Sequence, residues 1–410
     1  MDLGPFPRGI NNRTKKHDLP EGTLRNAVSV DIDDAGNLSR RSGMTKSYSG
    51  LNCRGGFSSP AGSFFLEDHR LMQFDGSAVT ELGQGFTGDH LAHHYLDQVL
   101  YLSDGNRCVR VDSGALADWG LPIPQSPGLS ATSGTLGSGV YLAAIAYVDS
   151  DGRQSGLSSI KSISLSDNSG VIIQSLPGAP SSIITAPSYL RLFLSAANGE
   201  VLYRVADVAL ATASYTVSAA YHEDGFEVVW QPLGPPPPGR IIRSHGGRIY
   251  IADDTGLVWY SKPGSLHLFD LAHDFLLFSE PVTVMEPVES GIFFATDSRT
   301  EFHLGADPEE GFQVVEKYNY GAPFGTGRRL VFDAQASVLW QSHRGTLIGA
   351  PDGSLRNAQE DAVPDVGTEA AGLVRERDGI RQFIASIKDG APGTVAASSW
   401  ITAEVIRRSS

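Results

Sequence analysis

A repeated strand–turn–strand pattern runs along most of this sequence and limits the folds that it can adopt. Each copy has two short runs of hydrophobic or β-branched residues, joined by a polar turn that usually contains Asp, Gly or Ser. An opening copy lies over residues 27–41, and successive copies are usually about 30–45 residues apart, with one much longer gap. The later copies cover residues 63–74, 98–111, 247–261, 291–304, 337–349 and 373–385.

Recurrent hairpins at this spacing are typical of a β-propeller. In that fold each blade buries its faces against its neighbours, so several blades are needed for a stable ring. The copies contain no Trp-Asp dipeptide, so we do not expect the WD40 type. No stretch shows a sustained 3.6-residue hydrophobic period, and long helices are therefore not expected either.

The long gap contains a different unit, expected over residues 126–234. Ser126-Pro127-Gly128 opens it, and the four prolines of residues 235–238 close it as a stiff spacer. About seven short strand candidates in about a hundred residues fit an immunoglobulin-like sandwich. The segment holds no cysteine, so the fibronectin type III kind is expected. The clearest candidates are residues 140–148, 171–173, 189–194 and 214–217.

The sequence therefore predicts an all-β protein, with a β-propeller-like body and an inserted immunoglobulin/fibronectin III-like β-sandwich. The expected divisions are an N-terminal basic arm over residues 1–24, a first set of blades over 25–125, the insertion over 126–234 and a second set of blades over 235–410.

The arm is basic on an acidic chain. The chain has 32 Lys and Arg against 46 Asp and Glu, a formal net charge of −14. One interpretation of the arm is a solvated tail. The other is a strap that docks on an acidic neighbouring subunit by charge complementarity. The candidate interaction residues are Arg8, Arg13, Lys15 and Lys16 in the arm, and Arg40 and Arg41 in the return strand of the first hairpin.

Composition argues against several functional classes. A dedicated nucleic-acid binder usually shows a basic face, although DNA can slide through an acidic channel without sticking. The two cysteines, Cys53 and Cys108, are too few for a disulfide framework. The N-terminus lacks the apolar stretch of a signal peptide, and the longest apolar run, over residues 140–148, is too short to span a bilayer. We expect a soluble protein made in a reducing compartment.

Motifs for chemistry are weak. A G-x-G-x-x-G match over residues 83–88 lies between hairpins with no following helix, so nucleotide binding is not expected. His90, His93 and His94 with Asp89 form the densest group of potential metal ligands, but zinc needs three or four converging ligands. Polar histidines at a strand edge are the simpler interpretation. The sequence predicts no catalytic residue, cofactor or metal, and no enzyme activity.

The N-terminal segment resembles the opening of the nozzle, or tubular tail, proteins of short-tailed bacteriophages. Those proteins begin with a Gly-containing arm, an Asn-Ala or Asn-Val hairpin and an Arg-rich return that ends near a Gly. Here the matching residues are Gly9-Ile10-Asn11-Asn12, Asn26-Ala27 and Arg40-Arg41-Ser42-Gly43. The hairpin over residues 249–264 is similar to blades of that family, and the sandwich between blades resembles their inserted immunoglobulin-like domains.

The resemblance covers the layout of most of the chain, and the motif over about the first forty residues. It implies a non-enzymatic structural protein of the virion tail, made in the host cytoplasm. The implied assembly is a homohexameric ring below the portal and adaptor, which extends the DNA-ejection channel, gates it before infection and holds fibres. The implied partners are further copies of the chain, the tail adaptor and other portal-side proteins, tail fibres and DNA in passage.

Two alternatives stay open from the residues alone. The first is a β-propeller that binds carbohydrate or cleaves polysaccharide, which would need carboxylates and aromatic side chains together at the mouth of the ring. The second is a receptor-binding protein at the tail tip, which differs from a nozzle protein mainly in the surface that meets the host.

Overall fold

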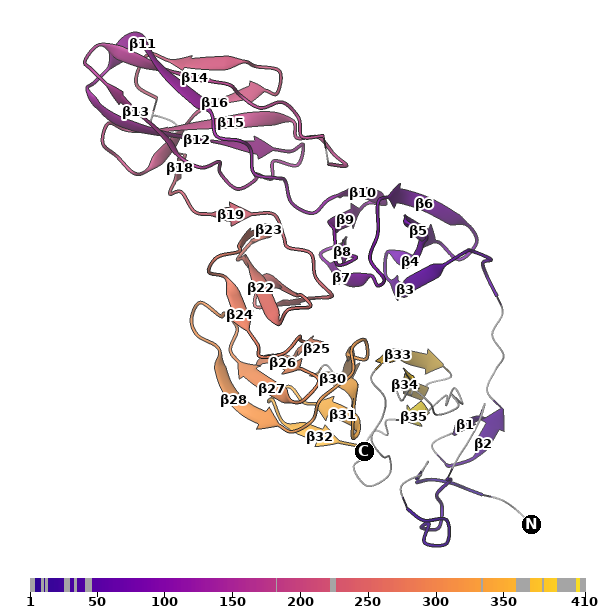
Figure 1. Cartoon of the computed structure of the whole chain (residues 1–410). Helices are drawn as coiled ribbons and strands as arrows, with labels where there is room; N and C mark the ends of the chain where they lie inside the picture. The colour runs from indigo at the N-terminus through magenta and orange to yellow at the C-terminus, as the bar shows by residue number, and fades with distance from the viewer. Residues whose placement is uncertain are drawn as a thin grey trace.

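The structure, a computed structural model of the full chain, describes residues 4–8, 11, 14–25, 30–32, 35–40, 46–181, 183–221, 226–332, 335–358, 369–377, 380–388 and 403–405. All its named elements are β-strands in antiparallel sheets, which confirms the all-β class. The residues that it describes include no helix long and apolar enough to cross a membrane. Sheets that follow one another around an axis form the body, and a sandwich projects from one side (Figure 1).

Two four-stranded sheets precede the insertion, and in each the strands pair in chain order. Blade 1 consists of β3 (Cys53–Ser59), β4 (Gly62–Glu67), β5 (Arg70–Phe74) and β6 (Val79–Gln84). Blade 2 consists of β7 (Ala92–Leu96), β8 (Val99–Ser103), β9 (Cys108–Asp112) and β10 (Ala115–Asp118).

Four sheets follow the insertion. Blade 3 consists of β20 (Ile241–His245), β21 (Arg248–Ala252), β22 (Leu257–Lys262) and β23 (Ser265–Asp270), with β19 (Leu233–Gly234) on β23 and β24 (Phe275–Leu277) on β22. Blade 4 consists of β25 (Val284–Pro287), β26 (Gly291–Ala295), β27 (Thr300–Leu304) and β28 (Gln313–Tyr318). Blade 5 consists of β29 (Arg328–Phe332), β30 (Gln335–Ser342), β31 (Gly345–Gly349) and β32 (Leu355–Asn357). Blade 6 consists of β33 (Glu369–Arg377), β34 (Ile380–Lys388) and β35 (Ala403–Val405).

The predicted hairpins are the two middle strands of blades 1 to 5 and the first two strands of blade 6. The opening hairpin is β1 (Val30–Ile32) with β2 (Leu38–Arg40). Strand β1 contacts β35, so the first hairpin lies beside the last sheet (Figure 1).

Each pair of consecutive blades shares a hydrophobic cluster, as a propeller requires. Leu66 and Leu100 belong to the cluster of blades 1 and 2. Ile249 belongs to that of blades 2 and 3, where Trp119 also lies. The remaining clusters include Tyr250 with Phe294, Phe293 with Trp340, and Leu339 with Phe383. The aromatic residues of the middle strands are therefore interblade core, and the β-propeller-like body is confirmed.

The inserted sandwich has two sheets, and its strands run from Gly128 to Val228. One sheet pairs β11 (Gly128–Leu136), β14 (Ser169–Gln174) and β17 (Ser214–Val217). The other has the order β13 (Lys161–Leu165), β12 (Gly139–Val148), β15 (Tyr189–Ser195), β16 (Leu202–Ala209) and β18 (Glu227–Val228). Consecutive strands cross repeatedly between the sheets, which is the immunoglobulin-like pattern predicted from the sequence.

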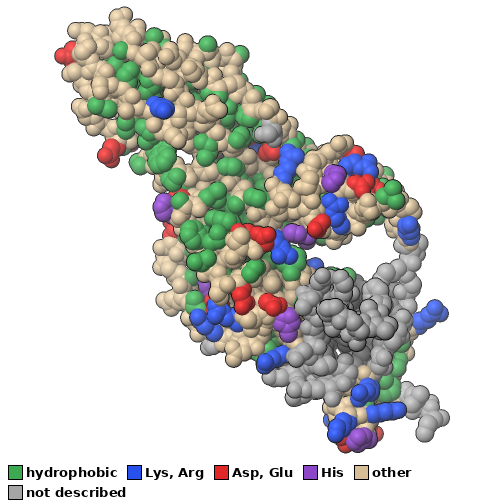
Figure 2. Space-filling view, in the orientation of Figure 1, with side chains coloured by type: hydrophobic (Ala, Val, Ile, Leu, Met, Phe, Trp, Pro, Cys, Tyr) green, Lys and Arg blue, Asp and Glu red, His purple; other side chains and the backbone are tan. Residues whose placement is uncertain are grey.

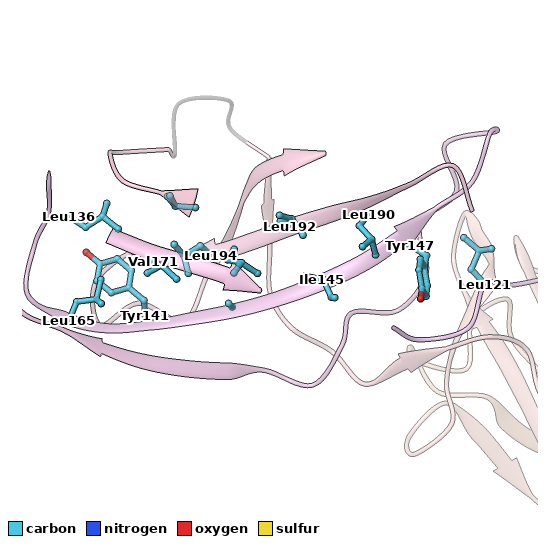
Figure 3. Close-up of a cluster of buried hydrophobic side chains, with 13 residues drawn as sticks. Leu121, Leu136, Tyr141, Ile145, Tyr147, Leu165, Val171, Leu190, Leu192 and Leu194 are labelled. Carbon is cyan, nitrogen blue, oxygen red and sulfur yellow. The ribbon is translucent and has the colours of Figure 1, made fainter. Parts of the chain in front are cut away.

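Strand β12 explains why the sequence shows one continuous apolar run. Its residues Tyr141, Ile145 and Tyr147 face the core between the two sheets, as Figure 3 shows. The alternating Ala144 and Ala146 face a second cluster on the outer side, which also contains other buried residues. A strand that is buried on both faces reads as a hydrophobic run and not as an alternation.

The loop after β12 fixes the sandwich to the propeller. Arg153 Nη1 donates a hydrogen bond to the Trp119 carbonyl at 2.9 Å, next to blade 2. His267 Nε2 of blade 3 lies 3.1 Å from the Gln154 carbonyl. An ion pair also joins Arg110 of β9 to Asp151. Contacts to two blades from one loop hold the sandwich in a defined orientation.

Candidate functional site

The described arm residues combine an anchored backbone with exposed charges. The backbone amides of Phe6, Arg8 and Asn11 donate to the carbonyls of Gly36, Gly22 and Leu24 at 2.7, 3.0 and 2.7 Å. Arg8, Lys15, Lys16 and Arg40 are all exposed. Arg13 and Arg41 lie outside the described residues. Two of these hydrogen bonds fold the arm back on itself, and the bond to Gly36 joins it to the turn of the first hairpin.

Gly36 is what lets the arm approach so closely. Its φ is +83°, and a Cβ there would lie 2.4 Å from the Pro7 nitrogen. Only glycine combines that backbone conformation with so little space. The turn between β1 and β2 is thus shaped to hold the arm.

The cationic side chains of the arm are available to a partner. No ion pair between described residues involves Arg8, Lys15, Lys16 or Arg40. Figure 2 shows Lys and Arg side chains gathered at the end of the molecule opposite the sandwich. We call the four exposed cations among the described predicted interaction residues the arm surface.

A second candidate site lies where the first strands of the blades converge. The segments at β3, β7, β20, β25 and β29, from five blades, line a partly open cavity of about 160 Å³, which we call the axial cavity. Its titratable lining residues are His90, His93, Arg240, Arg243, Glu286 and Arg328.

An ion pair joins blades 3 and 4 at the axial cavity. Arg243 Nε lies 3.2 Å from both carboxylate oxygens of Glu286, and Arg243 Nη2 donates to Oε1 at 2.5 Å. Arg243 Nη1 donates to the Ile242 carbonyl at 2.8 Å. Only 2% of the surface of Glu286 is exposed, so this charge-assisted pair is shielded from water.

Arg240 and Arg328, the two other arginines of the cavity, have no carboxylate partner among the described residues. The Arg328 Nη1 donates to the neighbouring Gly327 carbonyl at 2.5 Å. Its pKa is lowered by burial and by Arg243, while Glu286 opposes the shift. The Arg240 guanidinium lies 4.3 Å from the centre of the Phe324 ring as a cation–π contact. Within the described part of the chain, neither side chain forms an ion pair.

The histidines that were predicted to lie at a strand edge are found on β7, the first strand of blade 2, or just before it. His93 stacks on Phe57 of blade 1 with ring centres 3.7 Å apart. His94 Nε2 lies 2.8 Å from Ser244 Oγ of blade 3. Burial, assisted by Arg243, lowers the pKa of each to about 3. Strand β7 is the terminal strand of its sheet, so the predicted edge position is confirmed for His93 and His94. The rings are half-buried, however, because they contact the neighbouring blades.

The structure brings His90 and His93 into one cavity, but it does not assemble a metal site from them. Among the described residues, no group of three or more His, Cys, Asp or Glu could hold a metal ion. Burial lowers the pKa of His90 as well, and its Nε2 is buried without a hydrogen-bond partner.

No sequence motif marks the charged residues of the axial cavity as one site. Arg240, Arg243, Glu286 and Arg328 come from three blades and share no local motif. A signal was available: each lies at or just before the first strand of a blade, the strand nearest the axis. Aligning the hairpin copies on their preceding strands would have placed these charges together.

Comparisons with known proteins give no family. No family model and no curated protein matches the chain. The crystal structure of BBS1N in complex with ARL6DN is 9% identical, covers 84% of this chain and 93% of its own, and has a TM-score of 0.36. The extracellular domain of BT4673 from B. thetaiotaomicron is 10% identical, covers 81% of this chain and 36% of its own, and has a TM-score of 0.30. The AfRom2 CNH domain is 8% identical, covers 83% of this chain and 91% of its own, and has a TM-score of 0.26. Because all three TM-scores are below 0.5, we infer neither a fold nor a function for this chain from these structures.

Proposed function

We propose that this chain is a structural protein of the tail of a short-tailed bacteriophage. In this proposal it is a nozzle subunit, which forms a homohexameric ring and extends the DNA-ejection channel below the portal and adaptor. The observation that carries the proposal is the arm surface: a backbone-anchored, basic strap at the end of the molecule opposite the sandwich. It lies in the same segment whose residues resemble the opening of nozzle proteins.

The packing between the blades of the subunit suits a rigid channel wall. Consecutive blades are joined by hydrophobic clusters, and further polar contacts cross between blades, such as that of His94 with Ser244. The loop after β12 ties the sandwich to blades 2 and 3. A subunit with interfaces of this kind keeps its shape when neighbours press on it, because close-packed interiors transmit strain.

The charges suit self-assembly and DNA passage. The chain carries a net charge of −14, so the arm surface of one copy is attracted to the acidic surface of the next. An acidic channel wall repels the phosphates of DNA and keeps transit fast. The remaining surfaces are then available to the adaptor and to tail fibres, as the resemblance implies.

Light scattering at low and high salt tests the proposal. Wild-type protein should form a ring at low ionic strength, and this ring should weaken in high salt because surface charges are screened. The triple charge reversal Arg8→Glu, Lys15→Glu and Lys16→Glu should leave monomers. The matched control reverses three exposed cations elsewhere, Lys161→Glu, Arg344→Glu and Arg356→Glu, and should still assemble.

Two results would overturn the proposal. One is assembly of the arm variant to the same extent as wild type. The other is a wild-type monomer that turns over polysaccharide in a reducing-sugar assay, which would favour the carbohydrate-cleaving alternative.

A further inference from the structure

We propose that the axial cavity binds a small doubly charged oxyanion of the phosphate class, held by the guanidinium groups of Arg240 and Arg328 beside the Arg243–Glu286 pair. This inference concerns the inside of one propeller. It does not depend on ring assembly or on the arm surface.

Charge is the first argument. The cavity is lined by three arginines and one carboxylate, so its formal charge is 3 − 1 = +2. The lining histidines, His90 and His93, have lowered pKa values and do not add to that charge at neutral pH. This excess of positive charge among the lining residues favours an anionic ligand. A dianion such as hydrogen phosphate balances this excess, because a phosphate group carries about −1.5 to −2 charges at pH 7.

Unused hydrogen-bond donors are the second argument. A guanidinium has five N–H donors in a fork that matches phosphate oxygens. Arg243 is occupied by Glu286 and by the Ile242 carbonyl. Among the described residues, the Arg328 side chain makes one hydrogen bond, to the Gly327 carbonyl, and the Arg240 side chain makes none but lies over the Phe324 ring.

The volume of the axial cavity favours a small ligand. A cavity of about 160 Å³ holds several waters or one small oxyanion, since a single water needs about 10–15 Å³ of such space. Pockets for drug-sized ligands span about 300–1,000 Å³, so a whole nucleotide is not expected to enter. Arg240 precedes blade 3 and Arg328 begins blade 5, so a bound anion would link two blades that are not consecutive.

Calorimetric titration of the full chain with sodium phosphate, sulfate and acetate at matched ionic strength tests the site. Phosphate and sulfate should bind and raise the melting temperature, because a ligand that binds only the folded state stabilises it. The monoanion acetate should do neither. Equal effects of acetate and phosphate, or no binding of phosphate at millimolar concentration, would overturn the proposal.

Substitutions locate the site. Arg240→Gln and Arg328→Gln should each weaken phosphate binding by about tenfold or more, the effect of losing a charge-assisted hydrogen bond. Arg328→Gln should fold normally, because burial disfavours the charged guanidinium and Arg328 forms no ion pair with the described residues. Arg344→Gln, an exposed arginine on the turn between β30 and β31, is the control and should bind as wild type. Undiminished binding by both cavity variants would refute the assignment. Because calorimetry does not read assembly, its outcome is independent of the ring.

Discussion

Replacing Glu286 with Gln should destabilise the propeller by about 3–5 kcal/mol, the usual cost of removing one partner of a buried ion pair. The structure accounts for that size. Glu286 is 2% exposed and accepts from Nε and Nη2 of Arg243. Hydrogen bonds to charged groups contribute about 1.5–3 kcal/mol each. The substitution also leaves Arg243 facing Arg328 with no carboxylate between blades 3 and 4.

Equilibrium urea unfolding followed by tryptophan fluorescence measures the loss. Trp340 is buried in the cluster of blades 4 and 5 and reports on the propeller, whereas Trp230 reports on the sandwich. Glu289→Gln, an exposed carboxylate on the turn after β25, is the control and should change stability by less than about 0.5 kcal/mol.

A double variant tests whether Arg243 and Glu286 are energetically coupled. Adding Arg243→Gln to Glu286→Gln should cost less than the sum of the two single changes, because the second removes the charge that the first left unpaired. A Glu286→Gln variant as stable as the Glu289→Gln control, or strict additivity with Arg243→Gln, would refute the reasoning.

Two further predictions concern pH and packing. His93 and His94 have a pKa of about 3 in the folded protein, against about 6.5 when unfolded, so the unfolded state binds more protons and stability falls as the pH is lowered from about 6.5 towards 3. His94→Gln should flatten the slope of unfolding free energy between pH 6.5 and 5 by up to about 1.4 kcal/mol per pH unit, and an unchanged slope in urea titrations would contradict this. At Gly156 an added Cβ would lie 1.7 Å from the Leu233 carbonyl oxygen, so Gly156→Ala should destabilise the junction of sandwich and blade 3 by about 1–3 kcal/mol. Gly137→Ala is the control, because nothing lies within 4 Å of an added Cβ there, and it should show no comparable loss of thermal stability. Similar melting temperatures for the Gly156→Ala and Gly137→Ala variants would count against the predicted clash with Leu233.

Sequence patterns located the middle strands of the blades but not the outer ones. Middle strands such as β26 are buried along their whole length and therefore read as compact hydrophobic runs. Outer strands such as β6 are largely exposed and polar, so their pattern does not differ from that of a loop. The β12 run of the sandwich was predicted for the same reason as the middle strands, since both of its faces are covered.

The two candidate sites differ in how far the sequence could reveal them. The arm surface is a local run of charges, so its residues were named directly, but its hydrogen bonds to Gly22, Leu24 and Gly36 depend on tertiary structure. The axial cavity combines side chains from blades that are far apart in the chain. Spacing along the chain alone does not show this meeting; only the alignment of the blade repeats on their first strands places these charges together, because the ring geometry brings those strands to one axis.

Single-particle electron microscopy of the purified chain at low ionic strength tests the central proposal most directly. A tail nozzle subunit should give closed six-fold rings around an open channel, with the β-sandwich visible as a projection on each subunit. Isolated propellers at every protein concentration, with no ring classes, would contradict the assignment.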